Sequence, residues 1–183
     1  MSIVEKIVEI FEKHGDEEYL GEPVTMAEHM LQAAHFAREA GETDEIVVAA
    51  LLHDIGHFTS DLGTFSMADV EDRYHEDAGA RFLAAHFPSV VVDCCKHHVA
   101  AKRYLCATDP SYFAKLSEAS VHSLNLQGGP MDAAEVTAFE QEPNLGAIVR
   151  VRLYDDQGKD PDLEVPALPA YHSLLETCAR AAA

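Results

Sequence analysis

The sequence is poor in positive charge: 13 Lys and Arg residues stand against 32 Asp and Glu residues, and the formal net charge is −19. Nucleic acids and anionic membranes are bound by basic surfaces, so we expect neither as a partner. A small anionic substrate would have to be captured by a few local cations. The candidates, although any one of them could be an ordinary solvated charge, are Lys102, Arg103, Arg150 and Arg152.

Long apolar runs are also absent. No stretch of the sequence approaches the roughly 20 consecutive apolar residues that cross a bilayer. Residues 1–15 carry charges every few positions, which favours an amphipathic helix over a signal peptide. We therefore expect a cytoplasmic protein with no membrane anchor.

Cysteines are few, and their spacing excludes two common uses. Cys94, Cys95, Cys106 and Cys178 form no CxxC pair, and two of them are adjacent. This arrangement suits neither a zinc knuckle nor a disulfide framework. We expect reduced and mostly buried thiols.

Strand patterns are almost absent, whereas helical patterns are frequent. Val4, Ile7, Val8 and Phe11 follow the i, i+3, i+4, i+7 spacing of an amphipathic helix. Further helices are expected over residues 23–40, 43–52, 75–86, 88–102, 132–141, 145–154 and 169–180, and another begins at 109–110. Residues 57–74 and 155–169 should be loops, and residues 127–130 should break the chain. With no repeat and no long linker, we predict one all-α domain over residues 1–183.

The ends of two helices carry specific signals. Pro23 is placed to begin one helix, and Gly41 follows its expected end. Thr43 can cap the next helix, whose first turn contains Asp44 and Glu45.

The sequence contains eleven histidines, and their placement is more informative than their number. His53 and Asp54 end an apolar run, where a charged residue is costly to bury unless it is paired or binds a metal. Neighbouring residues on a helix point about 100° apart. A bidentate Asp54 could therefore bridge two metals while His53 binds one. His57 comes four residues after His53, on the same face.

Other histidines and an aspartate extend this pair to a possible two-metal site. His29 lies on the preceding predicted helix, and Asp155 follows a later apolar helix. His75 could be a ligand or a capping histidine, and spacing does not choose between His97 and His98. Four imidazoles and two carboxylates suit Fe or Mn, with zinc as an alternative. A structural role is favoured for the histidines that lack such a pattern, which are His14, His35, His86, His122 and His172.

A histidine, a His-Asp pair and a distant aspartate resemble the pattern of the HD-domain superfamily, which implies a single compact HD-domain helical bundle. Four segments sharpen the resemblance: HVAAKRYL (98–105), LSEAS (116–120), QGGPMD (127–132) and RLYDDQGK (152–159). They resemble the small HD-domain mixed-valent diiron oxygenases that cleave organophosphonates, which are distant relatives of myo-inositol oxygenase. The resemblance covers roughly residues 18–166.

The resemblance implies a set of roles. The metal ligands would be His29, His53, Asp54, His75, His98 and Asp155, with Asp54 bridging an Fe(II)/Fe(III) pair. The phosphonate would be bound by His57, Lys102, Ser120, Gln127 and Arg152. Tyr19 would occupy an iron site before the substrate arrives, and Glu22 would hold Tyr19 there and later face the cationic nitrogen of the substrate.

The implied reaction uses O₂ to cleave the C–P bond of a 1-hydroxyphosphonate. The substrate would be 1-hydroxy-2-(trimethylammonio)ethylphosphonate or 1-hydroxy-2-aminoethylphosphonate, giving phosphate and glycine betaine or glycine. We favour the quaternary substrate, for which Tyr19, Phe58, Phe65, Tyr74 and Tyr104 could supply aromatic walls. A 2-oxoglutarate-dependent hydroxylase is the expected pathway partner.

Two other functions remain open at this point. One is an HD-domain metal-dependent phosphohydrolase that acts on a nucleotide or phosphate ester, where a metal-bound water is the nucleophile. The other is a catalytically inactive HD module that serves as a binding scaffold.

Overall fold

The computed structural model describes residues 1–19, 21–59 and 74–181. For residues 180 and 181 it describes the backbone alone. Within these ranges the fold is all-α, as predicted, and the one β-type pairing is an isolated bridge between Glu18 and Thr25. None of the described helices is long and apolar enough to span a bilayer. The elements are α1 (Ile3–His14), α2 (Met26–Glu39), α3 (Asp44–Leu52), α4 (Gly56–Thr59), α5 (His75–Leu83), α6 (Ser89–Thr108), α7 (Pro110–Phe113), α8 (Glu118–Leu126), α9 (Ala133–Phe139), α10 (Leu145–Gln157), the 3₁₀ helix η1 (Leu168–Tyr171) and α11 (His172–Ala181).

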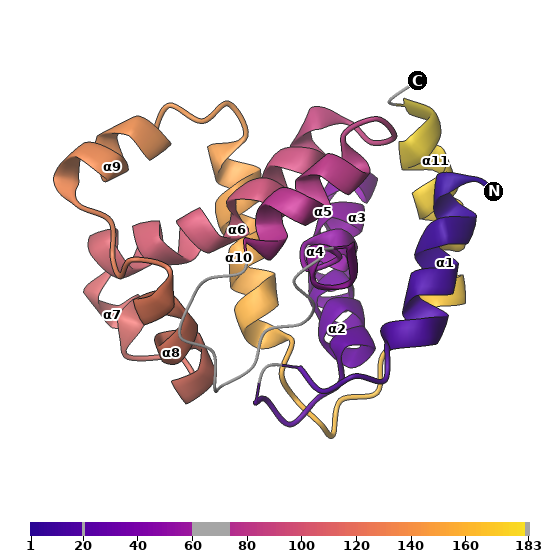
Figure 1. Cartoon of the computed structure of the whole chain (residues 1–183), viewed down its shortest axis with the longest axis horizontal. Coiled ribbons are helices and arrows are strands. Elements are labelled where there is room, and N and C mark those ends of the chain that lie inside the picture. Colours follow the sequence, from indigo (N-terminus) through magenta and orange to yellow (C-terminus); the bar gives the residue numbers. More distant parts are fainter. Residues whose placement is uncertain (20, 60–73, 182–183) are drawn as a thin grey trace.

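The centre of the fold is α3, whose residues from Ile46 to Leu52 are all buried. It packs against α2, α6, α10 and α11, and α5 covers α6. Helices α1 and α11, near the two ends of the chain, pack together at one edge, while α7, α8 and α9 lie toward the opposite edge (Figure 1). The apolar residues of α3 thus form the centre around which α2, α6, α10 and α11 pack.

Helix caps explain where several elements begin. Ser2 and Glu5 form a reciprocal capping box at α1, and Thr25 and Glu28 form another at α2. The predicted start of α2 at Pro23 was therefore too early, because the chain becomes helical only after the Thr25 hydroxyl caps it. Gly41 follows α2 with a φ of +75°, a conformation that favours glycine.

The structure corrects other predicted boundaries. Thr43 occupies the N-cap position of α3, but its side chain makes no capping hydrogen bond. The helix at 88–102 continues to Thr108, where Asp109 begins the short α7. The predicted loop at 57–74 begins with residues of α4, and residues 60–73 lie outside the described ranges. The helix predicted to begin at 109–110 had no predicted end, and α8 was not predicted as a separate helix. Its N-cap is Ser117, whose hydroxyl accepts a hydrogen bond from the Ser120 amide.

The most important correction concerns α10. It runs to Gln157, so Asp155 is a helical residue and the predicted loop at 155–169 begins only after it. Arg152 donates to Asp155 at i+3 and to Asp156 at i+4, which stabilises a polar last turn in the helix. As a result Asp155 is held by a helix and not by a loop.

Candidate metal centre

Six buried residues from five parts of the chain meet in the core. His29 comes from α2, His75 from the start of α5, and His98 from α6, while Asp155 comes from α10. His53 and Asp54 directly follow α3. All six side chains are buried, with exposures between 0% and 7%. Buried imidazoles and carboxylates in contact with one another are the arrangement expected of metal ligands.

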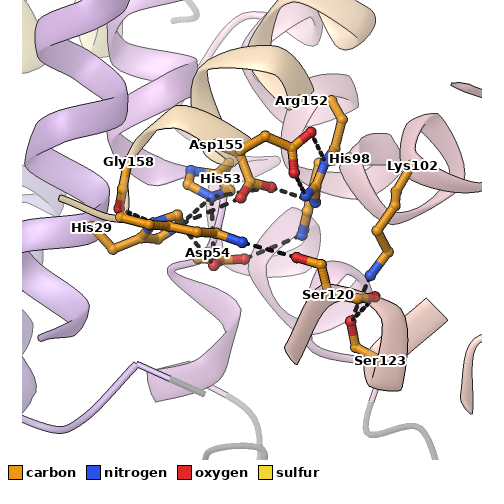
Figure 2. A network of polar contacts seen from close by, with 12 residues as sticks. His29, His53, Asp54, His98, Lys102, Ser120, Ser123, Arg152, Asp155 and Gly158 are labelled. Carbon is orange, nitrogen blue, oxygen red and sulfur yellow. Dashed lines mark hydrogen bonds and ion pairs between the residues drawn. The ribbon is translucent and has the colours of Figure 1, made fainter. Parts of the chain in front are cut away.

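Among the described residues, these side chains form two groups that could each hold a metal ion, one with His29, His53 and Asp54 and one with Asp54, His75 and His98. The two oxygens of Asp54 face different groups. Oδ2 lies 3.4 Å from Nε2 of both His29 and His53. Oδ1 lies 3.3 Å from Nε2 of His75 and 3.1 Å from Nε2 of His98. Asp54 therefore has the geometry of a bridging carboxylate (Figure 2).

Asp155 joins only the first group. Its Oδ1 lies 3.5 Å from Nε2 of His29, and its Oδ2 lies 3.7 Å from Nε2 of His53. The first group thus has two imidazoles and two carboxylates, whereas the second has two imidazoles and the shared Asp54. A metal ion held by the second group would therefore have more coordination positions open to a small molecule.

Backbone carbonyls fix the orientation of three of the imidazoles. Nδ1 of His29 lies 2.8 Å from the Gly158 oxygen, and Nδ1 of His53 lies 2.7 Å from the Ala50 oxygen. Nδ1 of His98 lies 2.7 Å from the carbonyl oxygen of Cys95. A carbonyl can only accept, so each Nδ1 carries the proton and each Nε2 presents a lone pair.

The distances between imidazoles agree with this tautomer. Nε2 of His29 and Nε2 of His53 are 3.1 Å apart, and those of His75 and His98 are 3.0 Å apart. When both imidazoles of the first pair are neutral, both Nε2 atoms present lone pairs, so they cannot hydrogen-bond to each other. A cation that both can bind resolves this repulsion, so the residues present fit a metal ion.

The protonation states also suit metal ligands. Burial alone would raise the pKa of Asp54, but His53 and the neighbouring imidazoles hold it well below its usual range. Burial would likewise raise the pKa of Asp155, and Arg152 and His53 lower it. Burial lowers the pKa of His98 to about 4. Two ionised carboxylates and a neutral His98 are therefore present at neutral pH. Burial would lower the pKa of His53, but Asp54 and Asp155 raise it to about 9, so a metal ion bound there replaces a proton.

A polar pocket opens on this centre. Besides the candidate ligands Asp54, His75, His98 and Asp155, its lining consists of Tyr19, Glu22, His57, Val99, Lys102, Ala119, Ser120, Ser123, Gln127, Arg152 and Lys159. They include every residue that the resemblance assigned to phosphonate binding, together with Tyr19 and Glu22. In Figure 2, Lys102 of α6 and Ser120 and Ser123 of α8 lie on the opposite side of the centre from His29.

Several polar atoms in the pocket have no hydrogen-bond partner within the described ranges. They include both ring nitrogens of His57, Oε1 of Gln127 and Oδ1 of Asp155, all buried. His57 stacks on His75 with 4.0 Å between ring centroids, and its Nε2 lies 3.8 Å from Oδ1 of Asp54. Burial, then the neighbouring His75, holds the pKa of His57 well below its usual value. Buried polar groups normally have partners, so these atoms indicate a place for a ligand.

The cations of the pocket are held in different ways. Lys102 is 3% exposed and its Nζ donates to Ser123 Oγ over 2.7 Å. Burial, together with nearby Arg152, lowers the pKa of Lys102 to about 7. Arg152 donates to Asp155 over 2.6 Å and also contacts Asp156 and Tyr112. Arg152 is thus tied to a candidate metal ligand as well as to the pocket.

Tyr19 and Glu22 both reach the pocket, from the segment before α2. The Tyr19 ring stacks on the His29 ring, with centroids 3.7 Å apart and an angle of 11° between planes. Burial, and then Asp54 and Asp155, raise the pKa of Tyr19 well above its usual value. The Glu22 carboxylate accepts from Ser117 and forms an ion pair with Lys159. That Tyr19 binds iron and that Glu22 holds it there stay predictions.

Two polar pocket residues were missed in the sequence. Lys159 and Ser123 are neither in the predicted metal set nor in the predicted phosphonate set, yet both line the pocket. Lys159 ends the RLYDDQGK segment, so its proximity to Asp155 was a usable signal. Ser123 lies three residues after Ser120 on α8, a helix that was not predicted.

The remaining candidates lie elsewhere. His97 is directed to Glu142, 3.8 Å away, so His98 is the residue that the structure brings into the cluster. Of the proposed aromatic walls, only Tyr19 lines the pocket among the described residues, and Phe65 lies outside them. Phe58 stacks on His14, Tyr104 lies near Phe139, and Tyr74 is largely exposed.

Comparison with known proteins gives a consistent result. The HD domain family model matches residues 26–124. A 1-hydroxy-2-(trimethylamino)ethylphosphonate dioxygenase (glycine-betaine-forming) from Leisingera caerulea is 66% identical over 165 residues, covering 90% of this chain and 84% of the relative. A hydroxymethylphosphonate dioxygenase from Gimesia maris is 44% identical over 176 residues, covering 96% and 87%. An uncharacterised protein of Acanthamoeba polyphaga mimivirus is 36% identical over 174 residues, covering 94% and 80%.

The chain belongs to the HD domain family and, within it, to the group of phosphonate dioxygenases. The predicted family resemblance is confirmed. These relatives favour an oxygenase over the phosphohydrolase and over the inactive scaffold.

Proposed function

We propose that this protein is a diiron oxygenase that uses O₂ to cleave the C–P bond of 1-hydroxy-2-(trimethylammonio)ethylphosphonate, giving phosphate and glycine betaine. One O₂ accepts the four electrons that the substrate carbon loses when it becomes a carboxylate. No separate reductant is therefore required. One observation carries the proposal: the two groups of candidate ligands share Asp54, and Asp54 lines a pocket that also contains cationic side chains and the Glu22 carboxylate.

The metal ions would be iron in an Fe(II)/Fe(III) pair. His29, His53 and Asp155 would hold one ion, His75 and His98 the other, and Asp54 both. A mixed imidazole and carboxylate set suits iron. Bound iron would supply the redox chemistry that activates O₂ and oxidises the substrate carbon.

The chain's own residues would bind and orient the phosphonate. Lys102 supplies a buried cation, Ser120 a hydroxyl, and His57 and Gln127 have buried polar atoms that lack partners among the described residues. A phosphonate needs cationic and neutral hydrogen-bond donors around its oxygens. Arg152 would contribute its charge while it holds Asp155 in place. Fixing the phosphonate in this way positions the carbinol carbon beside the metal centre, which is a large part of the catalytic effect in such reactions.

The nitrogen of the substrate would face Glu22. A trimethylammonium group cannot donate hydrogen bonds, so it is recognised by charge and by apolar or aromatic surface. Glu22 is the carboxylate that lines the pocket in addition to Asp54 and Asp155, and the Tyr19 ring lies in the same lining. A 2-oxoglutarate-dependent hydroxylase would supply the 1-hydroxy substrate.

The test is phosphate release from the protein loaded with Fe(II). We expect O₂-dependent release of phosphate from 1-hydroxy-2-(trimethylammonio)ethylphosphonate, with glycine betaine as the organic product. Glycine formed preferentially from the primary amine analogue would change the assigned substrate. Hydrolysis of phosphate esters under argon, with no phosphate from any phosphonate, would show that the oxygenase assignment is wrong.

A further inference from the structure

One ion pair in the pocket has no role in the predicted reaction. Nζ of Lys159 lies 3.0 Å from Oε1 of Glu22, and both side chains are mostly buried, at 14% and 10% exposure. The same nitrogen donates to Ser120 Oγ over 2.8 Å and reaches Ser117 Oγ at 3.4 Å. Lys159 therefore stands between the carboxylate of the pocket and a hydroxyl assigned to the phosphonate.

Glu22 is held in this arrangement from two sides. Its Oε1 accepts from the Ser117 hydroxyl as well as from Lys159. A mostly buried carboxylate is costly without a nearby cation, so the Lys159 charge stabilises Glu22 when the pocket contains no substrate. Lys102 does not serve this purpose, because its Nζ is bound to Ser123.

Lys159 is also anchored through its backbone. Gly158, its neighbour, accepts from His29, and the buried Gln32 side chain forms two hydrogen bonds with the backbone of Asp160, at 2.6 and 3.1 Å. The backbone on both sides of Lys159 is therefore fixed. The ammonium at the end of its flexible side chain can still change partners between Glu22 and Ser120.

We propose that Lys159 is the internal counter-ion of Glu22, and that the cationic end of the substrate displaces it from this carboxylate. The inference rests on the proposed function and extends it to a specificity-determining residue. The released Lys159 ammonium keeps its contact with Ser120, on the phosphonate side of the pocket. Exchange of one cation for another leaves Glu22 neutralised both before and after binding.

The exchange predicts how Lys159 affects two kinds of phosphonate. A substrate with a quaternary nitrogen replaces Lys159 at Glu22, so removal of Lys159 eliminates a competitor. Hydroxymethylphosphonate has no cation, so it needs Lys159 to keep the Glu22 charge neutralised. Without Lys159, the unpaired Glu22 repels the bound dianion.

The experiment measures dissociation constants by calorimetry on iron-loaded protein under argon, where no turnover occurs. The ligands are 1-hydroxy-2-(trimethylammonio)ethylphosphonate and hydroxymethylphosphonate. In Lys159→Met we expect weaker binding of hydroxymethylphosphonate, by about tenfold, with equal or tighter binding of the trimethylammonio compound. Glu22→Gln should weaken binding of the trimethylammonio compound more than binding of hydroxymethylphosphonate. The double variant should restore hydroxymethylphosphonate binding toward the wild-type value, because the repelling carboxylate is gone.

Matched controls separate this role from two others. Lys115→Met removes the same charge from an exposed lysine outside the pocket and should leave both constants unchanged. If Lys159→Met weakened the binding of both ligands equally, Lys159 would only bind the phosphonate group, and the proposal would be overturned. Loss of iron in that variant would mean a structural role and would overturn it too. A lower melting temperature of the ligand-free variant, restored in the double variant, is what an unpaired Glu22 predicts.

The wild-type protein tests the proposed function separately. Binding of both phosphonates without O₂-dependent phosphate release would overturn the proposed function and leave the counter-ion exchange to be decided by the variants. Failure of the wild-type protein to bind either phosphonate would overturn both.

Discussion

His29 on α2 and Gly158 after α10 are 129 positions apart in the sequence, yet Nδ1 of His29 lies 2.8 Å from the Gly158 carbonyl oxygen. This contact fixes the proton on Nδ1 and directs Nε2 toward Asp54 and Asp155. Gly158 follows Gln157, the last residue of α10, so the same turn that positions Asp155 also orients His29.

The close approach of Gly158 to His29 gives the first prediction. A Cβ at position 158 would lie 2.8 Å from the His29 carbonyl oxygen and 3.2 Å from its Nδ1. The φ of Gly158 is −76°, so alanine is not excluded by backbone strain and acts through close contacts with α2, of which those with His29 are the shortest. We expect Gly158→Ala to shift His29 and to weaken iron binding by about tenfold or more, as measured by competition with a chelator.

Gly146→Ala is the matched control for that variant. Gly146 lies in the first turn of α10, and the atom closest to an added Cβ is the flexible Arg150 Nη1 at 3.4 Å. Alanine in a helix should be neutral or stabilising by about 0.5–1 kcal/mol. Unchanged iron affinity in Gly158→Ala, or an equal loss in Gly146→Ala, would contradict the role given to the His29–Gly158 contact.

Asp54 and Asp155 should differ in how many metals they hold. Asp54 faces both ligand groups through different oxygens, whereas Asp155 approaches only His29 and His53. We expect Asp54→Ala to lose both irons and Asp155→Ala to keep the iron held by the second group. Elemental analysis of iron per chain measures this directly. Retention of two irons by Asp54→Ala would exclude the bridging role.

Much of the fold could be predicted from the sequence because its signals are local. The apolar run before His53 and the amphipathic spacing at the N-terminus give α3 and α1 directly. The end of α10 could not be found in this way, because Asp155, Asp156 and Gln157 have no apolar pattern. Their helical state depends on contacts with Arg152, which become visible only in three dimensions. That the whole chain is one domain stays a prediction.

The residues of the candidate site could likewise be predicted only in part from the sequence. The His53-Asp54 pair can be recognised by spacing, and the resemblance supplied the other ligands. Spacing could not choose between His97 and His98, because the choice depends on which face of α6 meets α5. Lys159 was missed because its partner Glu22 is far away in the sequence and is brought close only by the folded chain.

Gly56 provides a prediction on stability. A Cβ at this position would lie 1.8 Å from the His75 carbonyl oxygen and 2.7 Å from the Gly79 nitrogen, where α4 crosses α5. Backbone atoms cannot move aside cheaply, so we expect Gly56→Ala to lower the free energy of unfolding by about 2 kcal/mol or more. Denaturant unfolding of the metal-free protein measures this. A change below about 0.5 kcal/mol, the range of ordinary surface substitutions, would contradict the close crossing.

Lys102 provides the last prediction, which concerns pH. Burial lowers the pKa of Lys102 to about 7, so the free protein carries this charge below that pH and loses it above. An anionic phosphonate binds better to the charged form, so affinity should fall as the pH rises through about 7. Lys102→Ala should weaken binding about tenfold or more below this pH and keep its iron, because a hydrogen bond to a charged group is lost. Above it, the affinities of the variant and of the wild-type protein should converge.

Lys102→Arg is the control, because its side chain stays charged over the whole pH range and its affinity should not show the wild-type fall. The ionisation of the substrate itself is the same for all three proteins. Loss of iron in Lys102→Ala would instead place Lys102 in the support of the metal centre, and a parallel pH profile for the Arg variant would assign the fall to another group.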